Sequence, residues 1–314
     1  MGGHSENFLQ FFLDEVGKPV RQSVSLSEYA NFRIGGKADY FFCANSGSEL
    51  KRAVGLAREC SLPYYIIGGG YNLLFDDQGF RGLIIKNCSR SIQRTQKDRV
   101  QVFSGTPLPD FMKYCMEQSL TGIEFLAGIP GTVGGAVCGN AGAFDGEIGD
   151  HVVEALIFDE RGGELDVANE YFAFDYRSSL LKQKRDILLN VTLCLEEGDK
   201  DRIKTAVEEI LETRKKKHPP WSIACAGSFF KNPVLPDGRK VPAAQLLDQV
   251  GARGLMVGNA AVYENHANFI INKGGATSRD VCQLAAELKK RVKSAFGVEL
   301  QEEVISVPAN PRKS

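Results

Sequence analysis

The chain has almost no net charge, and this absence narrows the class of partner that it can have. Its 38 lysine and arginine residues nearly balance 39 aspartate and glutamate residues, which leaves a formal charge of −1 over 314 residues. Nucleic acids and anionic membranes attract proteins mainly through an excess of positive charge. We therefore expect neither as the main partner, and any charged ligand must be bound by local groups.

The sequence also lacks metal-ligand patterns and long hydrophobic runs. Its eight cysteines are scattered without a CxxC pair, and its four histidines show no metal-ligand spacing. No apolar run is long enough to span a bilayer, and the first residues contain no basic leader. These absences predict a cytoplasmic protein without a metal site, in which the cysteines act as small hydrophobic residues.

What is present is the composition of a folded protein with alternating strands and helices. Hydrophobic residues make up 43% of the chain and charged residues 25%, and the length allows two or three domains. Apolar alternation and β-branched runs predict strands at residues 40–42, 64–67, 83–85, 100–103, 152–158 and 187–195. Helical spacing predicts helices at residues 49–60, 110–118, 201–213 and 278–296. Basic residues 214–217 suit the end of the third helix, and the prolines that follow stop it.

Two glycine-rich runs are the most informative feature. Residues 126–147 read LAGIPGTVGGAVCGNAGAFDGE, and residues 68–72 read GGGYN directly after the predicted strand 64–67. Glycine lets the main chain approach a ligand closely, and a turn of main-chain amides suits a phosphate group. Either run alone could be only a tight turn. The two together favour one large phosphorylated ligand.

Nine short motifs follow one another along nearly the whole chain. They are NFRIGG at 31–36, GGGYNLL at 68–74, GFRG at 79–82, AGIPGTVGG at 127–135, NAGAF at 140–144, YRSS at 176–179, GSFFKNP at 227–233, HANFIIN at 266–272 and LQEEV at 300–304. In this order they closely resemble the UDP-N-acetylenolpyruvoylglucosamine reductases, the MurB family. The resemblance implies an α+β fold of the FAD-binding PCMH type, like that of vanillyl-alcohol oxidase. It also implies two FAD-binding subdomains, 20–88 and 89–200, and a substrate-binding C-terminal domain, 201–306.

The resemblance implies non-covalent FAD as cofactor, with NADPH as hydride donor. The first loop would hold the pyrophosphate through main-chain amides and the second would lie along the flavin side. The implied contacts are Gly68, Gly69, Gly70, Tyr71, Asn72, Leu73, Gly128, Pro130, Gly131, Thr132 and Gly134. Family members usually carry serine where this chain has Tyr71. Neither loop contains a histidine or cysteine that could bond to the flavin, apart from Cys138 beyond the end of the second loop.

The implied reaction is reduction of the enolpyruvyl ether of a UDP-sugar, a step of peptidoglycan precursor synthesis. Arg177 would be the fixed charge near the enol carboxylate, Glu303 would hydrogen-bond the developing aci-carboxylate, and Ser228 would donate the proton to C2. Without the resemblance, an arginine between polar neighbours is most often a surface residue and Ser228 could be a turn serine. In the acidic pair, the spacing of LQEEV favours Glu303 over Glu302.

The resemblance implies substrate contacts from Lys217, Asn232 and Tyr263, whereas His266 is expected to be structural. Some family members carry a tyrosine-bearing loop between YRSS and GSFFKNP, but this chain has no tyrosine between Ser178 and Ser228. It therefore resembles the shorter type, in which other residues must cover the nucleotide. We expect a monomer.

Two other classes stay open at this stage. A flavin-dependent oxidase of the same fold would share both glycine loops but has no need of GSFFKNP or LQEEV. A non-catalytic flavin- or nucleotide-binding module would need the loops but not Arg177, Ser228 and Glu303 together.

Overall fold

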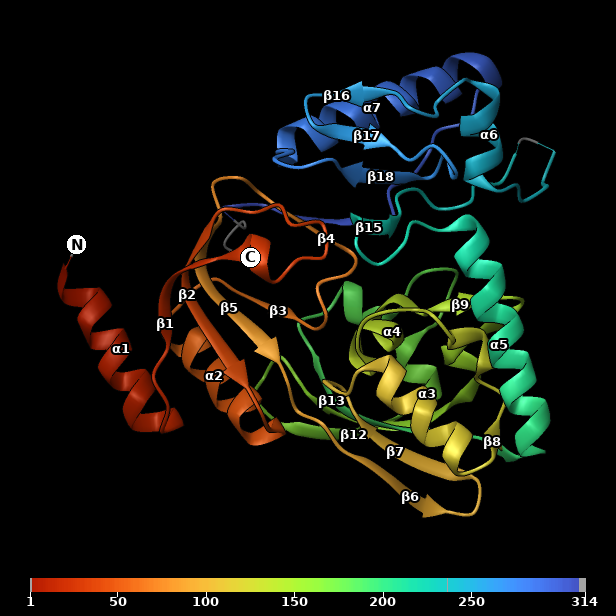
Figure 1. Ribbon diagram of the computed structural model, residues 1–314. Coiled ribbons are helices and arrows are strands. Elements are labelled where there is room, and N and C mark those ends of the chain that lie inside the picture. The colour runs from red at the N-terminus through yellow and green to blue at the C-terminus, as the bar shows by residue number, and fades with distance from the viewer. Residues whose placement is uncertain (1, 236, 311–314) are drawn as a thin grey trace. The chain divides into compact units, whose positions relative to one another are not determined.

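The computed structural model describes residues 2–235 and 237–310, with only the main chain for residues 2–7 (Figure 1). Contacts divide the chain into two compact units. Unit 1 comprises Met1–Arg21, Tyr40–Gly69 and Leu83–Arg214, and unit 2 comprises Gln22–Asp39, Gly70–Gly82 and Lys215–Ser314. The domain boundaries at 20–88, 89–200 and 201–306 stay a prediction.

The first sheet of the fold has the strand order β1-β2-β5-β3, and helix α2 covers it in unit 1 (Figure 1). Strands β3 and β5 run parallel, as expected for a strand–helix–strand segment. Helix α2 buries Leu50, Ala53, Val54 and Ala57, and the side chain of Ser46 caps it by accepting from the Glu49 amide at 3.2 Å. The elements are α1 (Gly2–Val16), β1 (Arg21–Ser25), β2 (Lys37–Ala44), α2 (Gly47–Glu59), β3 (Tyr64–Ile67) and β5 (Phe80–Asn87).

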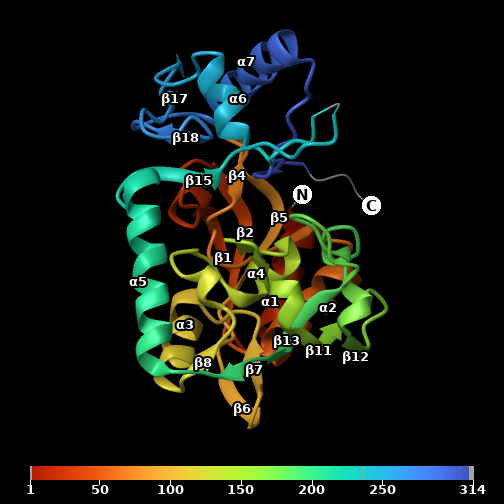
Figure 2. The ribbon, with the colours of Figure 1, turned by 90° about the vertical axis from the view of Figure 1, so that its right-hand side faces the viewer.

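The second sheet of unit 1 is antiparallel, with the strand order β12-β11-β13-β7-β6. A hydrophobic core forms where this sheet, α3, α4 and α5 bury their apolar side chains. Figures 1 and 2 both show α5 running alongside α3. The elements are β6 (Ile92–Gln96), β7 (Arg99–Phe103), α3 (Leu108–Glu117), β8 (Leu120–Thr121), η2 (Glu124–Leu126), α4 (Val133–Gly139), β9 (Gly142–Ala143), β10 (Gly146–Glu147), η3 (Ile148–His151), β11 (Val152–Phe158), β12 (Glu164–Ala168), η4 (Asn169–Phe172), η5 (Leu180–Lys182), β13 (Ile187–Cys194), β14 (Glu196–Glu197) and α5 (Lys200–Lys217).

Unit 2 is built on the antiparallel sheet β15-β18-β17-β16, against which α6 and α7 pack. Helix α7 begins with a capping box between Thr277 and Asp280 and ends at Gly297, whose φ of 69° suits glycine. A parallel pair, β4 and β19, joins Leu73 to Ile305. The elements are η1 (Leu26–Glu28), β4 (Leu73–Phe75), β15 (Ala224–Ser228), α6 (Ala243–Gln249), β16 (Met256–Val257), β17 (Ala260–Val262), β18 (Phe269–Asn272), α7 (Ser278–Phe296) and β19 (Ile305–Val307).

The sequence predictions of β3, β11 and α7 are confirmed to the residue. One region differs, because the second glycine-rich run is not a loop throughout. It turns into helix α4 after Thr132, whose hydroxyl accepts from the Gly135 amide at 3.3 Å. Gly134 therefore lies in the first turn of a helix, a position that glycine content alone argues against.

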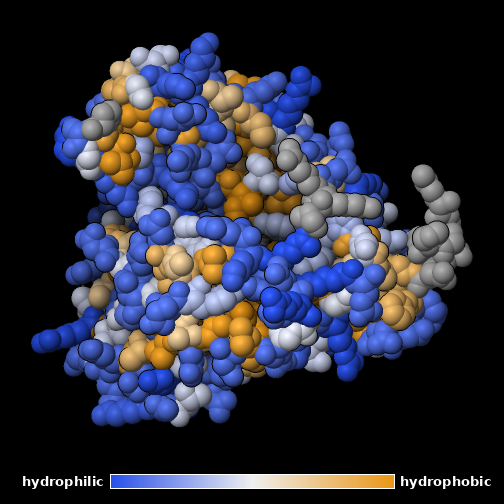
Figure 3. Space-filling model, turned by 180° about the vertical axis from the view of Figure 1, so that it is seen from behind, coloured by the Kyte–Doolittle hydropathy of each residue, from blue (hydrophilic) through white to orange (hydrophobic). Residues whose placement is uncertain are grey.

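The face in Figure 3 is mostly hydrophilic, with hydrophobic groups between the polar ones. In the part of the chain that the structure describes, no helix combines the length and hydrophobicity needed to cross a bilayer.

Candidate active site

Unit 1 brings the first glycine of one loop, Gly68, against the other loop. A Cβ atom on Gly68 would collide with the hydroxyl of Thr132, and one on Gly134 would lie 2.8 Å from the carbonyl oxygen of Ser104. Gly68 is therefore required by close packing against a side chain, and Gly134 by close packing against main chain. Gly68 and Thr132, both predicted to contact FAD, are neighbours, although more than sixty residues separate them in the sequence.

The rest of the first loop, Gly70 to Leu73, belongs to unit 2. Gly70 has a φ of 73°, and a Cβ there would collide with the Tyr29 carbonyl. Among the described residues, none accepts a main-chain hydrogen bond from the amides of Gly70, Tyr71 or Asn72. Unpaired amides in a tight turn are the donors that a pyrophosphate requires, so this loop fits the cofactor that the resemblance implies.

Asn72 also forms hydrogen bonds to the segment around Glu303, which the sequence did not predict. Its side-chain amide donates to the carbonyl of Glu303 at 3.1 Å, and its own carbonyl accepts from the Ile305 amide at 3.0 Å. The Glu303 amide donates to the Phe229 carbonyl at 2.8 Å. Main-chain bonds on both sides therefore position Glu303 beside the segment that follows Ser228.

The two acidic residues of LQEEV have different surroundings. Glu302 is exposed and forms an ion pair with Lys289 at 2.5 Å. Glu303 is half-buried. The difference is what the alternation of an extended segment predicts.

Ser228 lies at the end of β15, directly after a bulge. From Cys225 to Ser228, strand β15 advances three residues, whereas its partner β18 advances only two. Gly227, inside this irregularity, has a φ of 80°. A bulge redirects the side chains around it. The orientation of Ser228 is thus set by the main chain.

Asn268 holds the residues after Ser228 in place. This side chain is only 4% exposed, accepts from the Phe230 amide at 2.9 Å and donates to the Phe230 carbonyl at 2.9 Å. Its own carbonyl accepts from the Phe229 amide at 2.8 Å. The sequence predictions did not include Asn268, although an asparagine in an apolar run is a signal for such a buried contact.

Arg177 is held in a strained turn of unit 1. Its φ is 53°, and the main chains of Asp175 and Ser178 hydrogen-bond each other across it at 2.9 and 3.1 Å. The guanidinium donates to the carbonyl of Gly142 at 2.6 Å. A left-handed conformation is uncommon for arginine and persists only when neighbours enforce it.

The sequence did not point to these polar neighbours, of which Asn140 and Ser179 are buried and Lys182 is exposed. Asn140, 1% exposed, donates to the Asp175 carbonyl at 3.1 Å. Ser179, also 1% exposed, donates to the Cys138 carbonyl at 2.8 Å, and Lys182 donates to the Arg177 carbonyl at 2.7 Å.

A second arginine of unit 1 accompanies Arg177. Burial, and then the nearby positive charge of Arg177, lower the pKa of Arg214 from its usual value. The buried Nε of Arg214 has no hydrogen-bond partner among the described residues, and its guanidinium lies 5.5 Å from the ring centre of Phe144. Two neighbouring guanidinium groups, one with an unused donor, suit an anionic ligand.

The predicted substrate contacts lie in unit 2. Burial is the main cause that lowers the pKa of His266, and the charge of Lys217, at the end of α5, makes a smaller contribution in the same direction. The His266 amide donates to the Tyr263 carbonyl at 3.3 Å, which places Tyr263 in the same turn. Asn232 accepts from the Ala243 amide at 3.0 Å, so part of its side chain caps α6.

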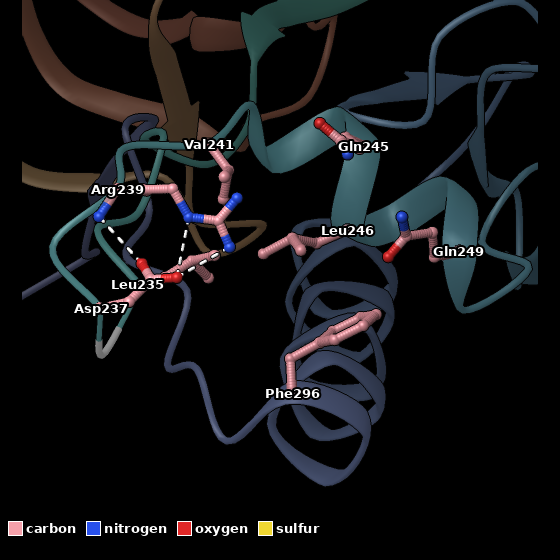
Figure 4. A pocket seen from close by; sticks show the side chains of 8 residues that line it. All are labelled: Leu235, Asp237, Arg239, Val241, Gln245, Leu246, Gln249 and Phe296. Carbon is pink, nitrogen blue, oxygen red and sulfur yellow. Dashed lines mark hydrogen bonds and ion pairs between the residues drawn. The ribbon is translucent and has the colours of Figure 1, made fainter.

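A separate pocket of about 380 Å³ opens in unit 2 beside α6 (Figure 4). Its charged residues, Asp237 and Arg239, pair with each other at 2.7 Å, which leaves little charge for a ligand. None of the predicted site residues lines it. In the described part of the chain, no cluster of three or more His, Cys, Asp or Glu side chains could hold a metal ion.

Comparison with known proteins defines the class first. Residues 38–168 match the model of an FAD binding domain, which agrees with the close-packed glycine loops. The chain is therefore a flavoprotein of α+β fold, as the sequence predicted.

The family follows from the rest of the chain. Residues 219–307 match the C-terminal domain of UDP-N-acetylenolpyruvoylglucosamine reductase. Two curated relatives named UDP-N-acetylenolpyruvoylglucosamine reductase, from Clostridium novyi and Clostridium botulinum, are similar over almost their full length. The first is 36% identical over 94% of this chain and 94% of its own. The second is 37% identical over 91% of this chain and 92% of its own. The chain belongs to the UDP-N-acetylenolpyruvoylglucosamine reductase family.

A solved structure supports the same family. The UDP-N-acetylenolpyruvylglucosamine reductase (MurB) of Thermus caldophilus superposes with a TM-score of 0.78 at 32% identity, over 92% of this chain and 99% of that one. The predicted family, fold class and FAD cofactor are confirmed. The individual site residues stay predictions.

Proposed function

We propose that this chain catalyses the NADPH-dependent reduction of UDP-N-acetylglucosamine enolpyruvate to UDP-N-acetylmuramate, as a cytoplasmic monomer that supplies peptidoglycan precursors. The membership of the family over nearly the whole chain carries this proposal. FAD, when bound, carries hydride from NADPH to the enolpyruvyl group.

The protein supplies charge and a proton around that transfer. In unit 1, Arg177 would stabilise the negative charge that develops on the substrate carboxylate, with Arg214 adding positive potential. A guanidinium suits this role because it stays charged and its position is fixed by the turn that holds it. In unit 2, Glu303 would share a proton with the same carboxylate.

Ser228 would donate the proton to C2 of the substrate. A free serine hydroxyl is a weak acid, so the site must stabilise the alkoxide that remains. The glycine bulge and Asn268 support the role because they fix the main chain around Ser228. Lys217, Asn232 and Tyr263 would contact the UDP-sugar. The amides of Gly68 to Leu73 and the run from Gly128 to Gly134 would hold FAD.

A spectroscopic experiment tests the function against the alternatives. The full-length protein should be yellow, acid should release its FAD, and NADPH should bleach the flavin absorbance. Under anaerobic conditions only the UDP-enolpyruvyl sugar should restore the absorbance. Rapid recovery with oxygen alone would favour an oxidase, and flavin that never bleaches would favour a binding module.

A further inference from the structure

A half-buried Tyr71 and an exposed Trp221 form an aromatic pair in unit 2, and no role has been assigned to Trp221. Trp221, the one tryptophan in the sequence, is 66% exposed. Its ring centre lies 6.5 Å from that of Tyr71, and the two ring planes meet at 84°. Tryptophan is usually well buried, and an exposed one next to another aromatic ring forms an apolar surface suited to a ligand.

The neighbours of this pair indicate the kind of ligand. Tyr71 lies between Gly70 and Asn72 in the turn whose amides are not used by other described main-chain groups. Three lysines, 215–217, and Trp221 come from the same short segment after Arg214. Unpaired amides and positive charge attract phosphate, whereas flat aromatic rings attract a base. A nucleoside diphosphate carries both groups on one molecule.

We propose that Tyr71 and Trp221 form an aromatic clamp for the planar base of a nucleoside diphosphate whose phosphates bind the amides of Gly70 to Asn72. The inference rests on the proposed function, which supplies two ligands of this chemistry, FAD and the UDP-sugar. Rings at right angles can offer a face and an edge to one base. The clamp also accounts for the tyrosine at a position where serine is usual in the family.

Tryptophan fluorescence gives a direct readout, because Trp221 is the one tryptophan in the sequence and it can be excited at a wavelength that tyrosine does not absorb. ADP and UDP are the probes, since neither absorbs the light that tryptophan emits. ADP and UDP are added separately to the full-length protein freed of flavin, because bound FAD would occupy the amides of Gly70 to Asn72. The expected result is a saturable change of emission with one of the two nucleotides. That nucleotide identifies which ligand the clamp holds.

Three variants connect the fluorescence to binding, and calorimetry measures their dissociation constants because the two Trp221 variants contain no tryptophan. Tyr71→Ser and Trp221→Ala should each raise the dissociation constant of the identified ligand roughly tenfold, which is typical for the loss of a base-stacking ring. Trp221→Phe keeps a ring and should recover most of the affinity. Leu165→Ala is the matched control, because it removes an exposed hydrophobic side chain, 49% exposed, from strand β12 of unit 1. Circular dichroism and thermal unfolding check that all four variants fold.

The outcomes separate this inference from the proposed function. If FAD binds and turnover is normal, but neither nucleotide changes the emission and no variant weakens binding, the clamp is wrong and the function stands. Equal weakening by Trp221→Ala and Trp221→Phe would also overturn it, because a clamp requires only a ring. If the wild type binds neither FAD nor the UDP-sugar, both ideas fail.

Discussion

Arg177 of unit 1 and Ser228 of unit 2 are both positioned by their main chain, but by different devices. Arg177 occupies a left-handed turn that buried polar side chains enforce. Ser228 ends a strand in which a glycine absorbs the unusual conformation one residue earlier. The first device stores strain in the functional residue itself, and the second moves it to a neighbour. The difference suits the roles proposed for them, because a charge must be fixed whereas a proton donor needs direction.

Of the two residues, Ser228 should show the larger effect of substitution. Ser228→Ala should leave flavin reduction by NADPH nearly intact and slow reoxidation by the enolpyruvyl substrate by roughly a hundredfold to ten-thousandfold, because a positioned proton donor is lost. Stopped-flow absorbance measures both half-reactions. Ser222→Ala, at an exposed serine of the same segment, is the control. Equal losses in both half-reactions would point to a role in folding or cofactor binding.

The acidic pair tests whether unit 2 offers one carboxyl group or two. Glu303→Gln should lower turnover by on the order of a hundredfold or more, because an amide cannot share a proton with the developing charge. Glu302→Gln should be nearly neutral, since the exposed pair with Lys289 contributes little. Steady-state kinetics follow a check of flavin content. A larger loss in Glu302→Gln would show that the register of the motif is wrong by one residue.

Unit 1 is tested by a change that keeps the charge of Arg177. Arg177→Lys should lower turnover by roughly tenfold to a hundredfold, because lysine cannot reproduce the planar guanidinium contact with Gly142 and the substrate. Flavin binding should not change. Arg161→Lys, at an exposed arginine, is the control. Full activity in Arg177→Lys would mean that the strained turn serves the fold alone.

The support of Ser228 is tested through stability. Asn268→Ala removes both partners of Phe230 in a buried site and should lower the free energy of unfolding by about 2–4 kcal/mol. Urea denaturation measures this change. Asn265→Ala, at an exposed asparagine of the same turn, should have little effect. Similar free energies of unfolding for the two variants would mean that Asn268 does not hold the segment after Ser228.

The smallest effect concerns pH. Burial, the largest cause, lowers the pKa of His266 below its ordinary value of 6.5. Below that value the unfolded chain binds a proton that the folded chain resists, so unit 2 should lose stability as the pH falls from 6.5 toward the folded pKa. His266→Gln should flatten this decline in urea titrations across that range. If the pH dependence of the free energy of unfolding were the same in His266→Gln, His266 would not be its cause.

Much of the fold could be predicted because its signals are local. Strand β3 and helix α7 follow from short apolar patterns and a capping threonine. Helix α4 could not, because its sequence is rich in glycine and its start depends on a hydroxyl cap within a packed loop. The choice of Glu303 rested on motif spacing, and the ion pair of Glu302 later gave it a physical reason.

By itself, the sequence determined the family, the glycine loops and the near-neutral charge, since motif order and composition require no knowledge of contacts. Only the tertiary structure decided that Gly68 meets Thr132, that Asn72 holds Glu303, and that Tyr71 faces Trp221. Each of these pairs joins residues at least sixty positions apart. Such pairs depend on how the core packs as a whole, and no local pattern encodes a long-range contact.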